Sequence, residues 1–206
     1  RTSAKTTAVT DPSSIDSASS LNVVVNKKRP LNPLRYVPSN LRLPVGIGNP
    51  NGQPLRAEAA TALEKIHAAG KKAGYNYYLM SGYRSYDYQA SLYSMYVRTR
   101  GQAWADSYSA RAGYSEHQTG LAADIYEHSS CTGACFGSSR AGLWLRNNAH
   151  KYGFILRYDQ GLQHAVGYAY EPWHFRYVGV GVATDMRNQG ISTLEAYYGL
   201  PAAPNY

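Results

Sequence analysis

The stretch from Ser115 to Asp124 constrains the fold of this chain more than any other segment. It reads SEHQTGLAAD and places a His and an Asp seven positions apart, with Gly120 between them. This spacing is too long for an i, i+4 pair on one helical face, and an odd spacing within one strand puts two side chains on opposite faces. A turn at Gly120 that leads into a new strand would let His117 and Asp124 converge, so we expect a turn and then a strand.

The two converging side chains indicate a metal site. A His nitrogen and an Asp oxygen both bind zinc well, but a third protein ligand is needed. The segment EPWH at residues 171–174 offers His174, with the carboxylate of Glu171 three positions before it. Three ligands would leave the fourth position open for water, as in catalytic zinc sites. Glu171 need not bind the metal and is our candidate for the general base.

These motifs resemble the zinc D-alanyl-D-alanine carboxypeptidases, the family that includes the VanY-type vancomycin-resistance peptidases. The pattern SxHxxGxAxD followed by ExxH carries the resemblance, together with SGYRS at residues 81–85 and WHFRYVG at residues 173–179. The resemblance extends from about residue 25 to residue 200. It implies Zn²⁺ as the cofactor, His117, Asp124 and His174 as its ligands, and peptidoglycan stem peptides that lose a C-terminal D-alanine as the substrates.

Several further residues are candidates for substrate binding. A guanidinium holds a carboxylate through two parallel hydrogen bonds, and the resemblance assigns this role to Arg84. The alternative for Arg84 is an Asp or Glu partner inside the fold. Ser115 and Gln89 match family positions near the substrate, and Tyr83 and Tyr86 could form pocket walls. For these four residues, ordinary packing is nearly as good an explanation.

The chain contains two cysteines, Cys131 and Cys135. The spacing CxxxC without a second cysteine pair argues against a structural zinc site. We therefore expect a disulfide that holds the loop after Asp124, provided that the protein is exported. The alternative is half of a metal site.

Length and composition indicate a single domain. The 206 residues suit a single core, and residues 1–20 are so poor in large apolar side chains that we expect a flexible tail or linker before a zinc carboxypeptidase domain at 21–206. No run approaches the roughly 20 apolar residues of a membrane span. The net charge of +8 is scattered and accompanied by no nucleic-acid motif, which favours an anionic cell-wall surface as a partner. We expect an extracytoplasmic monomer that binds no nucleic acid.

Hydrophobic periodicity and turn residues predict the elements. Helices are expected at residues 55–72, 86–100 and 141–151, and strands at 75–81, 120–125, 154–158 and 174–178, with a possible edge strand at 21–26. The prolines of residues 29–54 exclude long helices there and predict an arm that covers the core. In the second helix the expected buried stripe comprises Tyr88, Leu92, Met95 and Tyr96. Ser192 and Glu195 predict a capping box for a last short helix.

The order of these elements has no βαβ rhythm. We therefore predict an α+β fold, a single domain with a small antiparallel sheet flanked by helices and with the zinc site on the sheet. The favoured function is removal of the C-terminal D-alanine with D,D-specificity. An L,D-carboxypeptidase acting on tetrapeptide stems is a close alternative. A non-catalytic, zinc-bearing cell-wall binding module is a further alternative, but such a module has no need of a base such as Glu171.

Overall fold

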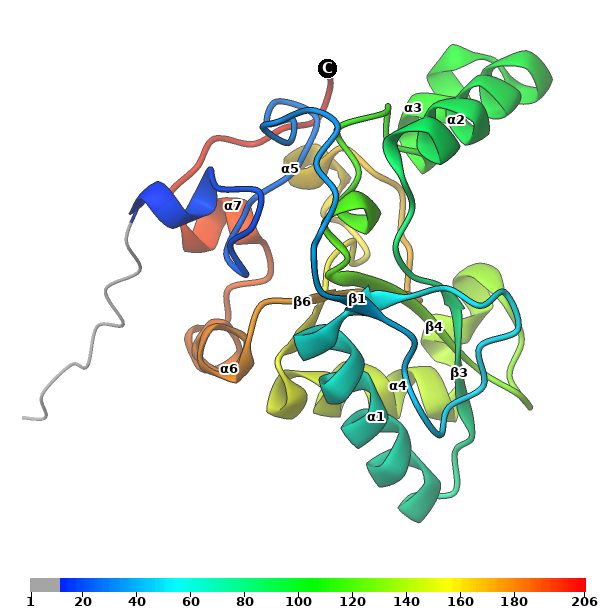
Figure 1. Cartoon of the computed structure of the whole chain (residues 1–206). Helices are drawn as coiled ribbons and strands as arrows, with labels where there is room; N and C mark the ends of the chain where they lie inside the picture. The colour runs from blue at the N-terminus through cyan, green and yellow to red at the C-terminus, as the bar shows by residue number, and fades with distance from the viewer. Residues whose placement is uncertain (1–11) are drawn as a thin grey trace, which may run out of the picture.

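The computed structural model describes residues 12–206, and a four-stranded antiparallel sheet lies at its centre (Figure 1). The strand order is β3-β4-β6-β5, and a separate two-stranded pair is formed by β1 and β2. The strands are β1 (Leu41–Arg42), β2 (Leu55–Arg56), β3 (Tyr77–Ser81), β4 (Ala122–Glu127), β5 (Phe154–Leu156) and β6 (His174–Tyr177). This architecture confirms the predicted α+β domain with a small antiparallel sheet.

Helices surround the sheet, and the three predicted from periodicity are present: the one predicted at 86–100 has those bounds, and the other two differ from the prediction at one or both ends. The α-helices are α1 (Ala57–Lys72), α2 (Tyr86–Arg100), α3 (Gln102–Tyr108), α4 (Arg140–Asn148), α5 (Gln163–Val166), α6 (Val180–Gln189) and α7 (Leu194–Tyr197). Short 3-10 helices are η1 (Pro12–Ile15), η2 (Glu116–Thr119), η3 (Gly133–Ser138) and η4 (Ala149–Tyr152). Helices α1 and α4 pack on one face of the sheet and enclose the main apolar core, which includes Leu63, Ile66, Leu79, Ile125, Leu145 and Phe175.

Alternation along β6 separates this apolar core from a polar face. Phe175 is fully buried in the core, and its neighbours His174 and Arg176 point to the opposite side, as successive side chains of a strand do. On the adjacent strand, Asp124 lies directly opposite His174. The sheet therefore places these charged side chains on the face turned away from α1 and α4.

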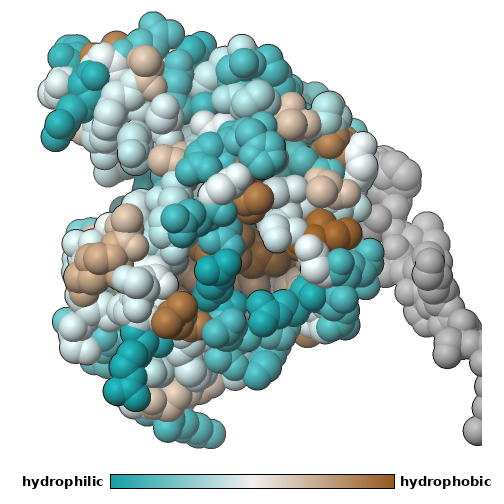
Figure 2. Space-filling view, turned by 180° about the vertical axis from the view of Figure 1, so that it is seen from behind, coloured by the Kyte–Doolittle hydropathy of each residue, from teal (hydrophilic) through white to brown (hydrophobic). Residues whose placement is uncertain are grey.

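Helices α2 and α3 form a hairpin that projects from the domain, at the upper right of Figure 1. Seen from behind, a notch separates this lobe from the rest of the molecule (Figure 2). The predicted buried stripe of α2 is wrong, because Tyr88 is 55% exposed, Met95 is 37% exposed, and Gln89 is the one buried residue of the helix. The other two predicted positions, Leu92 and Tyr96, are half-buried, so the apolar side of this projecting helix is covered only in part.

The N-terminal part of the chain packs more closely than we expected. Residues 1–11 of the predicted tail lie outside the described residues, whereas η1 and Ala18 in residues 12–20 contact the domain. Segment 21–26 is not the expected edge strand. Its valines are buried, but within residues 12–206 its strand-like pairing is limited to an isolated bridge from Asn26 to Arg29. The following arm, residues 29–54, contains no long helix, as the prolines predicted.

The C-terminal capping box is also wrong. The N-cap of α7 is Thr193, whose hydroxyl accepts a hydrogen bond from the Ala196 N–H, and Glu195 turns into the interior.

The structure contains a disulfide between Cys131 and Cys135, with a Cα–Cα distance of 6.0 Å, in the segment after β4. Within residues 12–206, no helix is long and apolar enough to cross a bilayer.

Candidate active site

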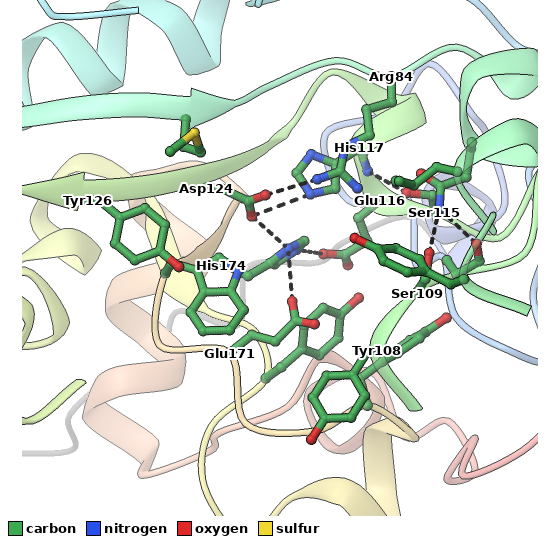
Figure 3. Close-up of a pocket in the computed structure, with 18 residues that line it drawn as sticks. Arg84, Tyr108, Ser109, Ser115, Glu116, His117, Asp124, Tyr126, Glu171 and His174 are labelled. Carbon is green, nitrogen blue, oxygen red and sulfur yellow. Dashed lines mark hydrogen bonds and ion pairs between the residues drawn. The ribbon is translucent and has the colours of Figure 1, made fainter. Parts of the chain in front are cut away.

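A cavity of about 280 Å³ lies between the α2–α3 hairpin and the polar face of β4 and β6 (Figure 3). Its lining includes His117, Asp124, His174 and Glu171, the four residues that the sequence motifs predicted to carry the chemistry. These side chains come from segments up to 57 residues apart in the chain, since 174 − 117 = 57. The fold therefore brings both motifs into one cavity.

Local structure at η2 explains how His117 and Asp124 converge. The Ser115 hydroxyl caps η2 by accepting a hydrogen bond from the His117 N–H at 3.3 Å. The helix ends at Gly120, whose φ of 70° is left-handed, and a Cβ there would lie 2.9 Å from Arg56 Cγ. Such a position strongly favours glycine. The turn predicted from the spacing is thus present, and it leads into β4 with Asp124 on the same side as His117.

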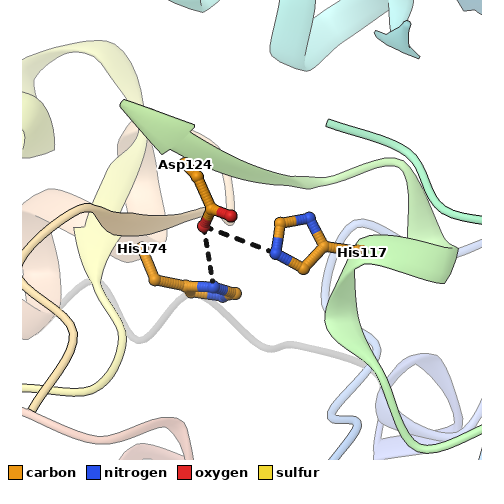
Figure 4. A group of neighbouring side chains, drawn as sticks. All are labelled: His117, Asp124 and His174. Carbon is orange, nitrogen blue, oxygen red and sulfur yellow. Dashed lines mark ion pairs between the residues drawn. The ribbon is translucent and has the colours of Figure 1, made fainter. Parts of the chain in front are cut away.

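The three proposed ligands form a compact group (Figure 4). One potential ligand atom from each of His117, Asp124 and His174 lies within 4.8 Å of the others, and all three residues are buried. Asp124 Oδ1 is 3.4 Å from His117 Nε2 and 3.3 Å from His174 Nδ1. The two imidazoles therefore present different nitrogens to the same carboxylate oxygen.

The remaining contacts of this group fit a zinc ion. Asp124 Oδ1 is buried and accepts no well-formed hydrogen bond. The outward nitrogens of the rings are both engaged, since His117 Nδ1 lies 2.7 Å from the Gly82 carbonyl oxygen and His174 Nε2 lies 3.2 Å from Glu116 Oε2. Such partners on the second nitrogen are usual for metal-binding histidines. Two nitrogens and one oxygen, with room in the cavity beyond them, match the donor set of catalytic zinc.

Electrostatics keep the ligand carboxylate ionised. Burial alone would raise the pKa of Asp124, but His117, His174 and Arg84 outweigh it and hold this pKa well below the usual range. Burial would lower the pKa of His174, yet the neighbouring carboxylates of Asp124 and Glu116 raise it to about 9. Burial and the positive charge of Arg84 lower the pKa of His117. A metal bound by His174 would compete with the proton on this ring.

Glu171 lies beside the ligand group without belonging to it. It begins a tight turn in which the His174 N–H donates to the Glu171 carbonyl at 3.0 Å. Its carboxylate Oε2 is 3.7 Å from His174 Nδ1, and burial raises its pKa to about 7. A carboxylate with this pKa can both accept and return a proton near neutral pH.

Arg84 faces the cavity but already has an acidic partner. Its Nη2 donates to Asp124 Oδ2 at 3.0 Å, and its Nε donates to the Ser81 hydroxyl at 3.0 Å. The side chain remains 19% exposed, and among residues 12–206 no hydrogen-bond acceptor is found for Nη1. The expected alternative of an internal partner therefore holds, although part of the guanidinium stays accessible to a ligand.

The other predicted contacts divide into two groups. Gln89 and Ser115 line the cavity. The Gln89 Nε2 donates to the Ser109 hydroxyl and to the Ala110 carbonyl, whereas its buried Oε1 has no hydrogen-bond partner among the described residues. Tyr83 and Tyr86 are not among the residues that line the cavity, and the Tyr86 ring instead lies under the Arg35 guanidinium. The tyrosines that do line it are Tyr96, Tyr108, Tyr126, Tyr158 and Tyr168.

One acidic residue at the site was missed by sequence reasoning. Glu116 lies inside the motif, next to His117, and contacts His174 from behind. The available signal was a carboxylate directly before a predicted ligand, with no further Asp, Glu, Lys or Arg between it and Asp124. Its partners could not be predicted, because they lie at least 41 residues away in the chain.

Comparison with known proteins identifies the family. A sequence model of the family described as "VanY: D-alanyl-D-alanine carboxypeptidase" matches residues 52–180, more than half of the chain. The chain belongs to the VanY family. It is therefore an enzyme, a metallopeptidase of the carboxypeptidase type.

Three proteins illustrate the similarity of this VanY-family chain to its relatives. A putative carboxypeptidase, YodJ of Bacillus subtilis, is 40% identical over 190 residues, which are 89% of this chain and 69% of that protein. The structure of the LdcB LD-carboxypeptidase matches with a TM-score of 0.82 and 39% identity over 88% of this chain and 87% of that one. A variant of the vancomycin-resistance D,D-pentapeptidase VanY in complex with Zn(II) matches with a TM-score of 0.72 and 29% identity, covering 87% and 98%.

Proposed function

We propose that this protein is a zinc-dependent carboxypeptidase that removes the C-terminal D-alanine from peptidoglycan stem peptides. The observation that carries the proposal is the buried His117, Asp124 and His174 group beside the carboxylate of Glu171 in one cavity. The VanY relative in complex with Zn(II) supports the choice of metal. Zinc bound by these three residues would polarise the scissile carbonyl and activate a water molecule for attack.

Glu171 is the proposed general base and acid. Its carboxylate takes a proton from the attacking water and then passes it to the amine of the departing D-alanine. Burial keeps the Glu171 pKa at about 7, so the same group is a competent acceptor in the first step and a competent donor in the second. The 171–174 turn holds this carboxylate on the cavity side of His174.

Arg84 is the proposed anchor for the terminal carboxylate of the substrate. Its hydrogen bonds to Asp124 and Ser81 fix the guanidinium at the cavity wall, with Nη1 free of acceptors among residues 12–206. A carboxylate that binds there places the last peptide bond near Asp124 and the other ligands. Gln89 and Ser115 are proposed to hydrogen-bond the peptide groups of the stem, because both line the cavity and Gln89 Oε1 is an unused acceptor.

Two specificities are candidates. The family description favours hydrolysis of a D,D bond, which is the preference we predicted from the sequence. The LD-carboxypeptidase LdcB shares 39% identity with this chain, against 29% for the D,D-pentapeptidase VanY, and this difference favours cleavage of an L,D bond in tetrapeptide stems. We rank the L,D activity first on that ground.

The decisive experiment is incubation of the zinc-loaded protein with pentapeptide and tetrapeptide stems, followed by mass spectrometry. Loss of one alanine from the tetrapeptide alone supports the L,D activity, and loss of one alanine from the pentapeptide alone supports the D,D activity. Release of an alanyl-alanine dipeptide, or no cleavage of either stem, would contradict the proposal. The Glu171→Gln variant serves as the control for contaminating peptidases.

We further propose that the protein acts outside the cytoplasm, at the cell wall. Peptidoglycan is the substrate of the LdcB relative, and the disulfide between Cys131 and Cys135 suits an oxidising compartment. The net charge of +8 would also favour contact with an anionic wall.

A further inference from the structure

A buried ionic network lies directly behind the proposed metal ligand His174. Glu116, at the start of η2, is almost fully buried and uses both carboxylate oxygens. Its Oε2 is 3.2 Å from His174 Nε2, and its Oε1 accepts from Arg157 Nε at 2.9 Å and from Arg176 Nη1 at 3.0 Å. Both guanidinium groups are completely buried, so Glu116 is held from two sides (Figure 3 shows its carboxylate beside the His174 ring).

The far side of the network reaches both ends of the domain. Glu195 of α7 accepts from Arg157 Nη1 and Nη2 at 2.9 and 2.8 Å, and from Asn26 at 2.8 Å. Arg176 Nη2 donates to the backbone carbonyls of Leu21 and Val23 at 3.0 and 2.7 Å. The two arginines are thus balanced by the carboxylates of Glu116 and Glu195, and the network depends on segments outside the 52–180 family match.

The stability of the fold does not by itself explain such a network. Burying four charges is expensive, and well-packed apolar side chains of similar volume often replace buried ion pairs without loss of stability. The contact that an apolar replacement could not reproduce is the one from Glu116 to His174. A buried imidazole needs an acceptor for its outer N–H, and the identity of that acceptor sets which nitrogen faces a metal.

The two ligand histidines have different acceptors beside the outer ring nitrogen. His117 has the backbone carbonyl of Gly82 at its Nδ1 and turns Nε2 toward Asp124. His174 has the Glu116 carboxylate at its Nε2 and turns Nδ1 toward Asp124. A carbonyl in the backbone cannot move independently, whereas a glutamate side chain has free rotamers unless other groups hold it. Arg157 and Arg176 supply that restraint.

We propose that Glu116 is a positioning residue for the metal site: fixed by Arg157 and Arg176, its carboxylate holds the N–H of His174 Nε2 and so directs Nδ1 to the metal. This inference rests on the proposed zinc site. Glu116 lines the rear of the cavity but is not one of the three grouped ligands, and its contact with that group is the one to His174 Nε2, so it acts through His174.

The test compares Glu116→Gln with Glu195→Gln in the full chain. Each substitution removes one buried carboxylate that contacts Arg157, but only Glu116 contacts His174, so Glu195→Gln is the matched control. Zinc affinity is measured by competition with a chromogenic chelator. We expect Glu116→Gln to weaken zinc binding by about 10–100-fold, the usual effect of losing an outer partner of a metal ligand. We expect Glu195→Gln to change it by less than about threefold, although both variants unfold at lower temperature than the parent.

Equal weakening in both variants would overturn the inference, because it would show a general effect of the lost charge. Unchanged zinc affinity in Glu116→Gln would overturn it as well. A parent protein that binds no zinc would instead refute the proposed function, and the inference with it. These failures are therefore distinguishable.

A second measurement does not depend on a variant that folds. Nitrogen-15 NMR of the zinc-loaded parent, labelled at histidine, reports which nitrogen of each ring carries a proton. We expect opposite patterns, with a proton on Nε2 of His174 and on Nδ1 of His117. A His174 ring protonated on Nδ1 and coordinated through Nε2 would overturn the inference.

Discussion

The two faces of the four-stranded sheet are built from alternate residues of the same strands, yet one buries apolar side chains and the other buries charged and polar ones. On the face toward α1 and α4, residues such as Ile125 and Phe175 are fully buried and apolar. On the other face, Asp124, His174 and Arg176 are equally buried but charged or polar, and each is paired. Burial alone therefore does not reveal what a position does in this protein; the identity of its partners does.

The difference between the faces also divides stability from chemistry. A buried apolar side chain stabilises a fold by about 1.5–3 kcal/mol, whereas buried ion pairs contribute little net stability. The apolar face should therefore account for most of the folding free energy, and the charged face for metal binding and catalysis. Substitutions on either face can test this separation.

The largest effect is expected on the charged face, from Glu171→Gln. Loss of a general base typically lowers the rate by about 10²–10⁴, and a base that also serves as the acid should lose more. Zinc content should be retained and the variant should fold, because Glu171 lies outside the three-ligand group. The assay is hydrolysis of the stem peptide that the parent cleaves. A variant within tenfold of the parent rate would show that Glu171 is not the base.

On the apolar face, Phe175→Ala should unfold the protein more readily without altering the site chemistry. Removal of a fully buried phenylalanine costs about 3–5 kcal/mol, which lowers the midpoint of thermal unfolding by on the order of 10 °C. Calorimetry checks the stability, and zinc titration well below the midpoint checks the site. Strongly weakened zinc binding in the folded variant would mean that the two faces are not independent.

Arg84 connects the charged face to the substrate, and its replacement tests specificity. Truncating one partner of a buried charge pair costs about 2–5 kcal/mol. For a substrate with a free C-terminal carboxylate, we expect Arg84→Ala to lose that much transition-state stabilisation, measured as a fall in kcat/KM. Arg84→Lys should recover little, because an ammonium cannot reproduce the guanidinium fork.

The C-terminal amide of the same peptide is the control for Arg84. The parent should cleave it poorly, and Arg84→Ala should cleave acid and amide at similar rates. If both substrates lose the same factor in the variant, Arg84 acts only as the partner of Asp124. Zinc content must be measured in parallel, since Asp124 is a proposed ligand.

The smallest effect concerns pH and the metal-free protein. The pKa of Glu171 is raised from 4.5 to about 7 by burial, so folding disfavours its ionised form. Glu171 should leave the free energy of unfolding unchanged below pH 4.5 and should lower it increasingly as the pH rises to about 7. We expect Glu171→Gln to be more stable than the parent by about 1–3 kcal/mol at pH 8, and equally stable at pH 4.

Urea unfolding at pH 4, 6 and 8 measures this difference. Glu64→Gln provides a control of opposite sign, because Arg42 lowers the pKa of Glu64 and that carboxylate stabilises the fold at high pH. A parent that is more stable than Glu171→Gln at pH 8 without metal would contradict the raised pKa.

The sequence predicted well where local rules decide. The spacing around Gly120 predicted a turn that brings His117 and Asp124 together, and both are found there. Apolar periodicity and proline predicted α1 and the arm before it. Prediction failed at Tyr88 and Met95 of α2, whose periodic side chains are exposed, because periodicity shows that a helix has an apolar face but not whether a core lies beside it.

The sequence by itself determined the chemistry available to this protein: two histidines, an aspartate and a glutamate in motifs typical of zinc peptidases. Only the tertiary structure decided how that chemistry is oriented. The nitrogen that each imidazole presents to Asp124 depends on its outer partner, which is Gly82 for His117 and Glu116 for His174. Glu116 in turn is held by Arg157 and Arg176, 41 and 60 residues away in the chain. Contacts of that length have no periodic signal, because they arise when distant segments pack around the same sheet.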